Sequence, residues 1–366
     1  MTDAGDGGGG HPDGERTTRR RYLIVGAGAI GGTIGGVLAR AGAPTVLVAR
    51  GRHADVLADV GLTLRTPDGI FITPVEAASR PEDVRLSAGD VLVFATKTQQ
   101  LDAALADWAD RPVHGPGGVL GTAGDLLPAL TALNGVVAEE KALRYFRRVF
   151  GVCVWLPAVH LEPGEVIARS WPVAGQFHVA RWPASISTAE DARLLAEIAE
   201  TWTDAGILVR IVDDVAAWKY NKLLSNLGNA VGALTAGATD AADVVDAVRR
   251  EGEAVLRRAA IDFVPFEKST AARADGPSVR PVPGWDGGPN NSTWQSLSRN
   301  TGNVETDFFN GEIVRLAHRH GGAAPLNGAL ARAARDAVRG GRGAGEYSAA
   351  QLRGLLGIDA VGAAHD

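Results

Sequence analysis

The sequence predicts an α/β Rossmann-type N-terminal domain with a mostly parallel sheet, followed by an all-α C-terminal domain. Three observations lead to this fold class. The chain has 366 residues, which exceeds the usual size of a single hydrophobic core. From Tyr22 onward, short β-type runs alternate with longer helical patterns, as in parallel sheets covered by helices. Beyond residue 212 strand-like runs almost vanish, and Ala- and Leu-rich helical patterns continue to residue 339.

The elements of the first domain follow from these runs in chain order. Short apolar, β-branched runs predict strands, and longer amphipathic runs predict helices. The expected elements are a strand YLIVG, a helix over 30–41, a strand TVLVAR, a hairpin from LTLRTP and GIFITPV, a buried strand DVLVFAT, a helix QLDAALADW, a strand GVLGT, two strands in RRVFGVCVWLPAVHLEPGEVIARS around Pro163-Gly164, and a strand QFHVARWP.

Composition divides the chain into four parts. Residues 1–20 are polar and Gly-rich, so they are expected to form a disordered tail. Residues 21–206 form the α/β domain, 207–339 the helical domain and 340–366 a C-terminal appendage whose one helical run is SAAQLRGLLG. Within the helical domain, residues 274–292 are dense in Pro and Gly and predict a long loop.

Composition also excludes several classes of protein. A formal net charge of −5 and the lack of a basic cluster interleaved with aromatic residues argue against a nucleic-acid partner. The single cysteine, Cys153, excludes an internal disulfide and a cysteine-based zinc site, and it suits the reducing cytoplasm. Residues 23–39 are uncharged and follow a basic flank, but six of these seventeen are Gly, so we expect neither secretion nor a membrane anchor. We expect no metal site.

A glycine-rich turn follows the first expected strand. Gly26, Gly28 and Gly31 have the G-x-G-x-x-G spacing, directly between a strand and a helix. The first glycine allows a tight turn, the second lets the backbone approach a pyrophosphate, and the third allows close helix packing. Ala29 and Ile30 complete the turn, where a helix N-terminus faces the anion. In a chain with 47 Gly the alternative is a merely flexible loop, but the surrounding strand–helix–strand pattern favours dinucleotide binding.

The end of the second expected strand carries a positive charge. Arg50 lies nineteen residues after Gly31, where a site that prefers NAD would place a carboxylate for the ribose 2′-hydroxyl. A guanidinium instead forms charge-assisted hydrogen bonds with the 2′-phosphate of NADP, and Arg52 is near enough to contribute. The alternative is that both arginines are solvated loop residues. We favour NADP(H) as the cofactor.

Two polar residues follow later strands. Lys97 comes after DVLVFAT, and Asn134 precedes Gly135 after another strand. In open α/β sheets the ligand lies beyond the C-terminal ends of the strands, so both residues point toward the cofactor. Each alone would be ordinary, because Lys at a strand end is usually solvated and Asn-Gly is usually a turn.

A predicted helix over 218–232 carries a polar stripe. Lys222, Asn226 and Asn229 are spaced i, i+4 and i+7, which places them on one face. Burial of such a stripe costs free energy unless partners replace the lost hydration, and a ligand is one such partner. The alternative is a solvated face, which is weakened by the scarcity of other charges between Asp214 and Asp240.

These motifs resemble the ketopantoate reductases (2-dehydropantoate 2-reductases) over nearly all of residues 21–330. The resemblance rests on GAGAIG, ATKTQQ, LNG, KLLSN and NSTWQSLSRNTGNVETDFFNGEIV, which occur in the family's order. It implies NADPH-dependent reduction of a 2-oxo acid to a 2-hydroxy acid, with ketopantoate or a close analogue as the substrate. It also implies an active site between the Rossmann domain and the helical domain.

The resemblance also implies residue roles. Lys222 is similar to the family's general acid, which protonates the carbonyl oxygen as hydride arrives at carbon. Glu305 resembles the glutamate that holds the substrate hydroxyl and helps to position the lysine, and Lys97 resembles a cofactor contact. The expected substrate contacts are Asn226, Asn229, Ser292 and Asn134, of which Asn134 also contacts the cofactor. The alternatives are a surface carboxylate for Glu305 and a simple helix N-cap for Ser292.

Some spacings depart from the family pattern. The second asparagine of the helix is usually four residues after the first, but Ala230 occupies that position and Asn229 comes one residue early. Ser292 and Glu305 are also one residue further apart than expected. These departures leave open another 2-oxo acid or another carbonyl of specialised metabolism. A non-catalytic NADP-binding sensor and an S-adenosylmethionine-dependent transferase also stay open, as does a homodimer.

Overall fold

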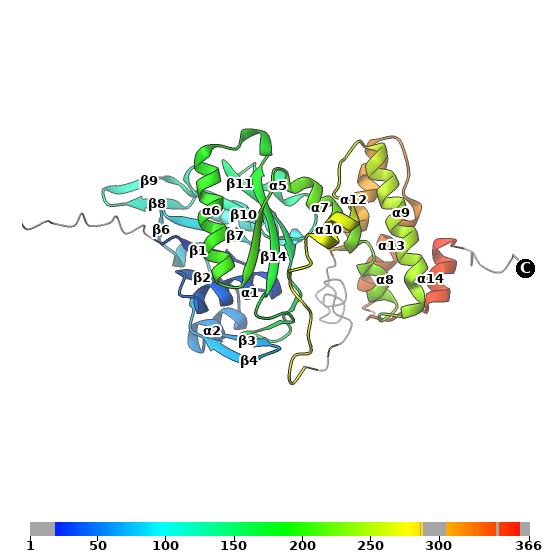
Figure 1. The fold of residues 1–366 in the computed structure, drawn as a ribbon, viewed down its shortest axis with the longest axis horizontal. Coiled ribbons are helices and arrows are strands. Elements are labelled where there is room, and N and C mark those ends of the chain that lie inside the picture. The colour runs from blue at the N-terminus through cyan, green and yellow to red at the C-terminus, as the bar shows by residue number, and fades with distance from the viewer. Residues whose placement is uncertain (1–18, 286, 288–304, 342–343, 359–366) are drawn as a thin grey trace, which may run out of the picture.

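The computed structural model describes residues 19–285, 287, 305–341 and 344–358. Most of the tail expected at 1–20, part of the loop expected at 274–292 and the end of the chain therefore lie outside the described residues. Ser292, an expected substrate contact, lies outside them as well. Figure 1 shows the α/β domain beside the helical domain.

The α/β domain is built on one eight-stranded sheet. Its strands, in spatial order, are β15 (Ile207–Ile211), β14 (Gly175–Trp182), β11 (Arg148–Trp155), β10 (Pro128–Thr131), β7 (Asp90–Phe94), β1 (Arg21–Val25), β2 (Thr45–Val48) and β5 (Glu76–Ala78). From β11 to β5 all neighbouring strands are parallel. β14 pairs antiparallel with β11, and β15 runs parallel to β14. The predicted mostly parallel sheet is confirmed.

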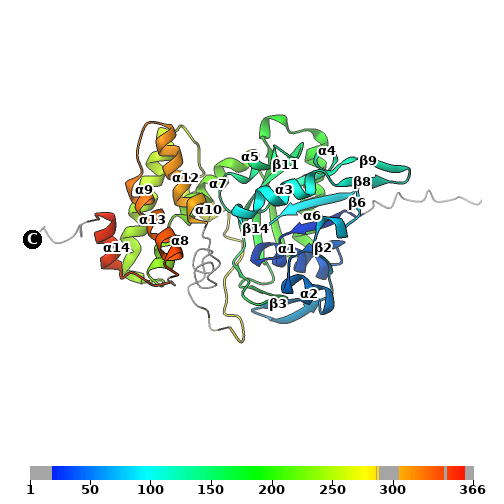
Figure 2. The same ribbon diagram turned by 180° about the vertical axis from the view of Figure 1, so that it is seen from behind.

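Helices cover both faces of this sheet. Tyr22 and Ile24 of β1 pack in one core with α1 and α6, while Leu23 and Val25 pack in a second core with α3 and α5. This alternation is the period of two expected of a strand that is buried on both faces. Figures 1 and 2 show α6 and α3 on opposite sides of the sheet. The helices of this domain are α1 (Ala29–Arg40), α2 (Arg52–Asp59), α3 (Leu101–Ala109), α4 (Ala123–Leu126), α5 (Ala138–Ala142) and α6 (Ala189–Asp204), with short 3-10 turns at η1 (Pro81–Asp83), η2 (Thr98–Gln100) and η3 (Ala184–Ile186).

Two smaller sheets flank the main one. One contains β12 (Ala158–Val159), β13 (Glu165–Ala168), β3 (Leu62–Thr66) and β4 (Gly69–Thr73), and the other β6 (Leu86–Ser87), β8 (Pro112–Gly115) and β9 (Gly118–Thr122). The predicted hairpin is confirmed as the antiparallel pair β3 and β4. The predicted strand GVLGT forms β9, which pairs with β8 outside the main sheet.

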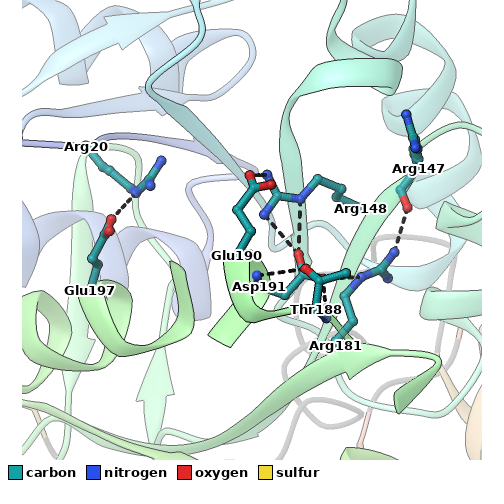
Figure 3. Close-up of polar contacts among 8 residues, drawn as sticks. All are labelled: Arg20, Arg147, Arg148, Arg181, Thr188, Glu190, Asp191 and Glu197. Carbon is teal, nitrogen blue, oxygen red and sulfur yellow. Dashed lines mark hydrogen bonds and ion pairs between the residues drawn. The ribbon is translucent and has the colours of Figure 1, made fainter. Parts of the chain in front are cut away.

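Charged contacts fix the start and the middle of α6 against the sheet (Figure 3). Thr188 and Asp191 cap the helix reciprocally, each accepting the other's backbone N–H. Arg148 of β11 donates to the Asp191 carboxylate at 2.9 Å, and Arg20 pairs with Glu197 further along the helix at 2.5 Å. Arg20 therefore has a defined partner at the end of the expected tail.

The helical domain surrounds its own apolar core. Its helices are α7 (Val215–Asn226), α8 (Asn229–Leu234), α9 (Ala242–Arg258), α10 (Phe266–Ala271), α12 (Thr306–Arg319), α13 (Pro325–Arg339) and α14 (Ala349–Leu356), with a 3-10 turn at η4 (Thr239–Ala241). The C-terminal segment is more than an appendage, because Ala349, Leu352 and Leu356 are buried in this core. Across the residues with described structure, no helix is both long and apolar enough to cross a membrane.

Two boundaries differ from those expected. The main sheet extends past residue 206 to Ile211, because β15 pairs with β14. The single helix predicted over 218–232 is wrong, since α7 ends at Asn226 and α8 begins at Asn229. Asn310 of α12 donates to the backbone carbonyl of Leu227 at 3.1 Å, and Gly228, a weak helix former, follows directly. A contact with a distant helix therefore stabilises the break.

Candidate active site

The sheet brings the expected cofactor residues to one edge. β10, β7, β1 and β2 are adjacent parallel strands, so the residues that follow their C-terminal ends lie side by side. In that order these are Asn134, Lys97, the glycine-rich turn at Gly26 and Arg50. Neighbouring strands lie about 4.8 Å apart, so the four positions form a row rather than a scattered set. This row is where open α/β sheets bind nucleotides.

The glycine-rich turn has the geometry that a pyrophosphate requires. Gly26 has a φ of 101°, and a β-carbon there would lie 2.9 Å from the backbone nitrogen of Thr96. A β-carbon on Gly31 would lie 2.0 Å from the carbonyl oxygen of Gly26, so the start of α1 packs directly on the turn. Gly28 is the N-cap residue of α1, and a β-carbon built there would meet no atom within 4 Å. As a glycine, it has no side chain to accept a hydrogen bond from the first helical amides. The first helical amides, which follow at Ala29 and Ile30, are therefore available to an anion.

This packing leads to a prediction for Gly31. In the Gly31→Ala variant the added methyl group must displace the Gly26 carbonyl, so we expect at least about tenfold weaker NADPH binding, the loss that follows from misplacing one charge-assisted backbone contact. Fluorescence titration with NADPH measures the loss. Gly89→Ala is the matched control, because its added β-carbon meets no atom within 4 Å. Equal NADPH affinity in the two variants would contradict the role of this turn.

A histidine holds the glycine-rich turn from outside. The backbone N–H of Gly164 donates to Nδ1 of His53 at 2.8 Å. Nδ1 is therefore unprotonated, and the proton on Nε2 is donated to the carbonyl oxygen of Ala27, also at 2.8 Å. His53 thus connects the turn to the loop before β13 and fixes its orientation.

Two arginines follow β2. Arg50 and Arg52 are both exposed, and neither forms an ion pair with another described residue. Arg52 is the first residue of α2, and Gly51 between them has a φ of 57°. Two guanidinium groups that lack carboxylate partners are thus positioned beyond the strand next to the glycine-rich turn. They could bind a phosphate group.

The expected catalytic lysine lies in a pocket beside this row. The pocket is narrow and partly open to solvent, and it is lined by Leu133, Asn134, Gly135, Cys153, Val154, Lys219 and Lys222. Asn134 comes from the end of β10, whereas Lys222 comes from α7, which packs on β11. The structure therefore brings together Lys222 and Asn134, which are far apart in the sequence and belong to different domains.

The environment of Lys222 lowers its proton affinity. The residue is half-buried, and its Nζ lies 3.6 Å from the centroid of the Trp155 ring. Loss of hydration lowers the pKa of Lys222 to about 8, and the positive charge of Arg273 acts in the same direction. The guanidinium carbon of Arg273 also lies 3.6 Å from the Trp155 centroid, so the two cationic centres are at most twice that distance apart. The result is an amine suited to proton transfer.

Cys153 forms part of the same pocket wall. Its Sγ donates to the backbone carbonyl of Trp218 at 3.4 Å, and burial raises the pKa of Cys153 to about 11. The group is therefore an uncharged thiol at neutral pH. It packs as a small apolar side chain beside Lys222.

Glu305 lies at the same edge of the sheet as Lys97. It is 7% exposed, and its Oε1 accepts from the hydroxyl of Thr98 at 3.0 Å and from the backbone N–H of Thr98 at 3.3 Å. Lys97 directly precedes Thr98 and is half-buried. Glu305 and Lys222 are both among the described residues, and no ion pair joins them. Glu305 therefore anchors the start of α12 to the loop after β7.

The two helix asparagines differ in their surroundings. Asn226 is 6% exposed, and its Nδ2 has no hydrogen-bond partner within the described parts of the chain. Asn229 is half-buried at the start of α8. Neither lines the pocket around Lys222. The Asn226 amide is thus the better placed of the two to bind a ligand.

Sequence reasoning missed three residues around Lys222. Trp155 and Arg273 form its immediate aromatic and cationic surroundings, and Lys219 lines the same pocket. The sequence carries a signal for Lys219, because it precedes Lys222 by three residues and so shares its helix face. No local pattern marks Trp155 or Arg273, since both reach the site only through tertiary packing.

Comparisons with known proteins agree with this arrangement. The sequence profile of the family described as "Ketopantoate reductase PanE/ApbA" matches residues 22–183, and the profile described as "Ketopantoate reductase PanE/ApbA C terminal" matches residues 214–337. The two matches together cover most of the α/β domain and most of the helical domain.

Individual proteins are also similar to this chain, and two sequence relatives and a crystal structure illustrate the likeness. The 2-dehydropantoate 2-reductase of Pyrococcus abyssi is 25% identical over 322 residues, which are 84% of this chain and 94% of that protein. The 2-dehydropantoate 2-reductase of Pyrococcus horikoshii is 27% identical over 218 residues, which are 58% of this chain and 64% of that protein. The crystal structure of a PanE/ApbA family ketopantoate reductase from Ralstonia eutropha JMP134 superposes with a TM-score of 0.68 at 24% identity, over 88% of this chain and 99% of that one, and supports the fold.

Proposed function

Because this chain belongs to the ketopantoate reductase family, we propose that it is an NADPH-dependent reductase of a 2-oxo acid. Ketopantoate is the favoured substrate, and pantoate is then the product. The observation that carries the proposal is the desolvated amine of Lys222, held in a pocket with Asn134 at the nucleotide-binding edge of the sheet.

The reaction adds a hydride to the carbonyl carbon and a proton to the carbonyl oxygen. NADPH, when bound, supplies the hydride and becomes NADP⁺. The Lys222 ammonium donates a hydrogen bond to the carbonyl oxygen, stabilises the negative charge that develops there, and gives up its proton. Asn134, across the same pocket, orients the substrate or the nicotinamide end of the cofactor. The 2-oxo acid is reduced to a 2-hydroxy acid, and Lys222 is left as a neutral amine.

The cofactor residues divide between two tasks. The amides at the start of α1 and the open space at Gly28 accommodate the pyrophosphate. Arg50 and Arg52 bind the 2′-phosphate that distinguishes NADP from NAD. Lys97, which follows the neighbouring strand β7, contacts the ribose.

A co-substrate screen tests the function. Purified protein is mixed with NADPH or NADH and with ketopantoate or a panel of branched and aromatic 2-oxo acids, and the fall in nucleotide absorbance is followed. We expect NADPH oxidation with at least one 2-oxo acid and slower oxidation of NADH. Nucleotide binding without oxidation by any 2-oxo acid would instead identify a sensor. Affinity for S-adenosylmethionine and none for NADPH would identify a transferase.

The lowered pKa of Lys222 predicts the pH dependence of the rate. A general acid must carry its proton before reaction, and kcat/KM reports the ionisation of the ligand-free enzyme, so kcat/KM for the 2-oxo acid should fall as pH rises through about 8. In the Arg273→Met variant a neighbouring like charge is removed, the pKa of Lys222 rises, and this fall moves to higher pH. Arg210→Met is the control, because Arg210 is an exposed arginine that does not shift the pKa of Lys222. A fall at the same pH in wild type and Arg273→Met would exclude Arg273 from this role.

A further inference from the structure

We propose that Lys219 binds the carboxylate of the substrate, and that Glu139 and Thr131 position its ammonium for this task. The inference rests on the proposed function, since it names the group that selects 2-oxo acids over uncharged ketones. It concerns a second lysine of α7, three residues before Lys222.

Lys219 and Lys222 face the same space. They are separated by three positions on α7, so they lie on one helix face, and both line the pocket that contains Asn134. Lys222 is half-buried, whereas Lys219 is only 3% exposed. Lys219 is therefore the more deeply buried of the two lysines, and it can contact the part of a ligand that lies deepest in the pocket.

A buried carboxylate holds the Lys219 ammonium in place. Nζ of Lys219 donates to Oε1 of Glu139 in a short ion pair, and Glu139 is fully buried. The hydroxyl of Thr131 donates to the same oxygen at 2.7 Å. Thr131 ends β10, the strand that leads to Asn134, and Glu139 belongs to α5. The ion pair is thus tied to the rigid edge of the sheet beside the site.

The Lys219 ammonium has hydrogen-bond donors that Glu139 does not use. An ammonium group has three donors, and Glu139 is the only hydrogen-bond partner of Nζ of Lys219 within the described structure. Buried donors that stay unpaired cost free energy, so a carboxylate in the pocket would satisfy a real deficit.

The charges of the pocket also suit an anionic substrate. When Lys222 is protonated, Lys219, Lys222 and the neighbouring Arg273 carry three positive charges, and Glu139 carries one negative charge. The remaining positive charge favours binding of a 2-oxo acid anion. A buried ion pair usually adds little stability over apolar residues of similar size, so holding an ammonium in the wall of the site is the more direct reason for this pair.

The test compares a charged substrate with its uncharged counterpart. The double variant Lys219→Met with Glu139→Leu removes both charges, so that neither is left buried and unpaired. The substrates are the 2-oxo acid that wild type reduces fastest and its methyl ester. We expect KM for the acid to rise by about tenfold to a hundredfold, as for the loss of a charge-assisted hydrogen bond. KM for the ester and for NADPH should rise much less than KM for the acid, because neither ligand offers a carboxylate to the Lys219 ammonium.

Three further variants serve as controls for the double variant. Lys219→Arg keeps the charge and should restore most of the preference for the acid. Lys268→Met makes the same side-chain change at an exposed position of α10 and should alter nothing. If the double variant does not fold, as judged by circular dichroism, the neutral hydrogen-bonded pair Lys219→Gln with Glu139→Gln replaces it and should show the same loss of preference.

The outcomes separate this inference from the proposed function. A wild-type protein that oxidises NADPH with no 2-oxo acid overturns both. A wild-type protein that is active, with an acid-to-ester preference unchanged by loss of Lys219, overturns only the role of Lys219. Loss of that preference in Arg273→Met, with the Lys219 variants unaffected, would assign the carboxylate to Arg273. An equal rise in KM for acid and ester would show that the pair has only a structural role.

Discussion

Replacing Lys222 with Ala is expected to lower kcat for the 2-oxo acid by about 10²- to 10⁴-fold, the range usual for loss of a general acid. The variant removes the only group that the proposal uses to protonate the carbonyl oxygen and to stabilise its developing charge. NADPH binding should stay measurable, because Lys222 contributes to the pocket and not to the glycine-rich turn. Steady-state assays give kcat, and fluorescence titration gives the affinity for NADPH.

The matched control for this variant is Lys268→Ala. It makes the same substitution at an exposed position of α10 and should leave kcat unchanged. Retention of wild-type kcat in Lys222→Ala would remove Lys222 from the mechanism. A loss of NADPH binding as large as the loss of kcat would show instead that the substitution disturbs the nucleotide site.

The Arg50→Glu variant is expected to bind NADPH about tenfold to a hundredfold more weakly than wild type, while NADH binding is unchanged or improved. Arg50 lies beyond β2 and has no ion-pair partner among the described residues, so it can form charge-assisted hydrogen bonds with a 2′-phosphate. A glutamate at that position repels the phosphate but can accept hydrogen bonds from the 2′-hydroxyl of NADH. Parallel titrations with the two nucleotides give the ratio of affinities.

The control for this charge reversal is Arg193→Glu. Arg193 is an exposed arginine of α6 that forms no ion pair within the described parts of the chain, and its reversal changes the net charge of the protein by the same amount. If both nucleotides lose affinity equally in Arg50→Glu, Arg50 acts on a group that they share. If neither loses affinity, the 2′-phosphate binds elsewhere, or the protein does not discriminate.

Local patterns predicted most of the α/β domain. The apolar runs that form β1, β2 and β7 are long enough to indicate buried strands by themselves. The sequence prediction lacks α6, although a signal is present, because Thr188 and Asp191 form a capping box before apolar residues at helical spacing. The break between α7 and α8 could not be predicted from propensity, since its stabilising contact comes from Asn310 in a distant helix.

In the candidate site too, local sequence patterns predicted some residues, whereas contacts between distant residues could not be predicted. Residues that follow strands or share a helix face were found, because topology dictates where they lie: Asn134, Lys97 and Lys222 are examples. The Lys219–Glu139 pair joins residues 80 positions apart, and each alone is an unremarkable charged residue in the sequence. The role of Ser292 stays a prediction, because it lies outside the described residues.

In the proposed mechanism, the Lys222 amine delivers the proton that accompanies hydride transfer. Single-turnover oxidation of NADPH by the 2-oxo acid, measured across pH for wild type and Lys222→Met, tests it most directly. With the 2-oxo acid well below its KM, we expect a wild-type rate that falls above about pH 8, the pKa of Lys222 in the ligand-free pocket, and a variant rate that is slow and lacks this fall. A variant that keeps both the wild-type rate and the same fall with pH would contradict it.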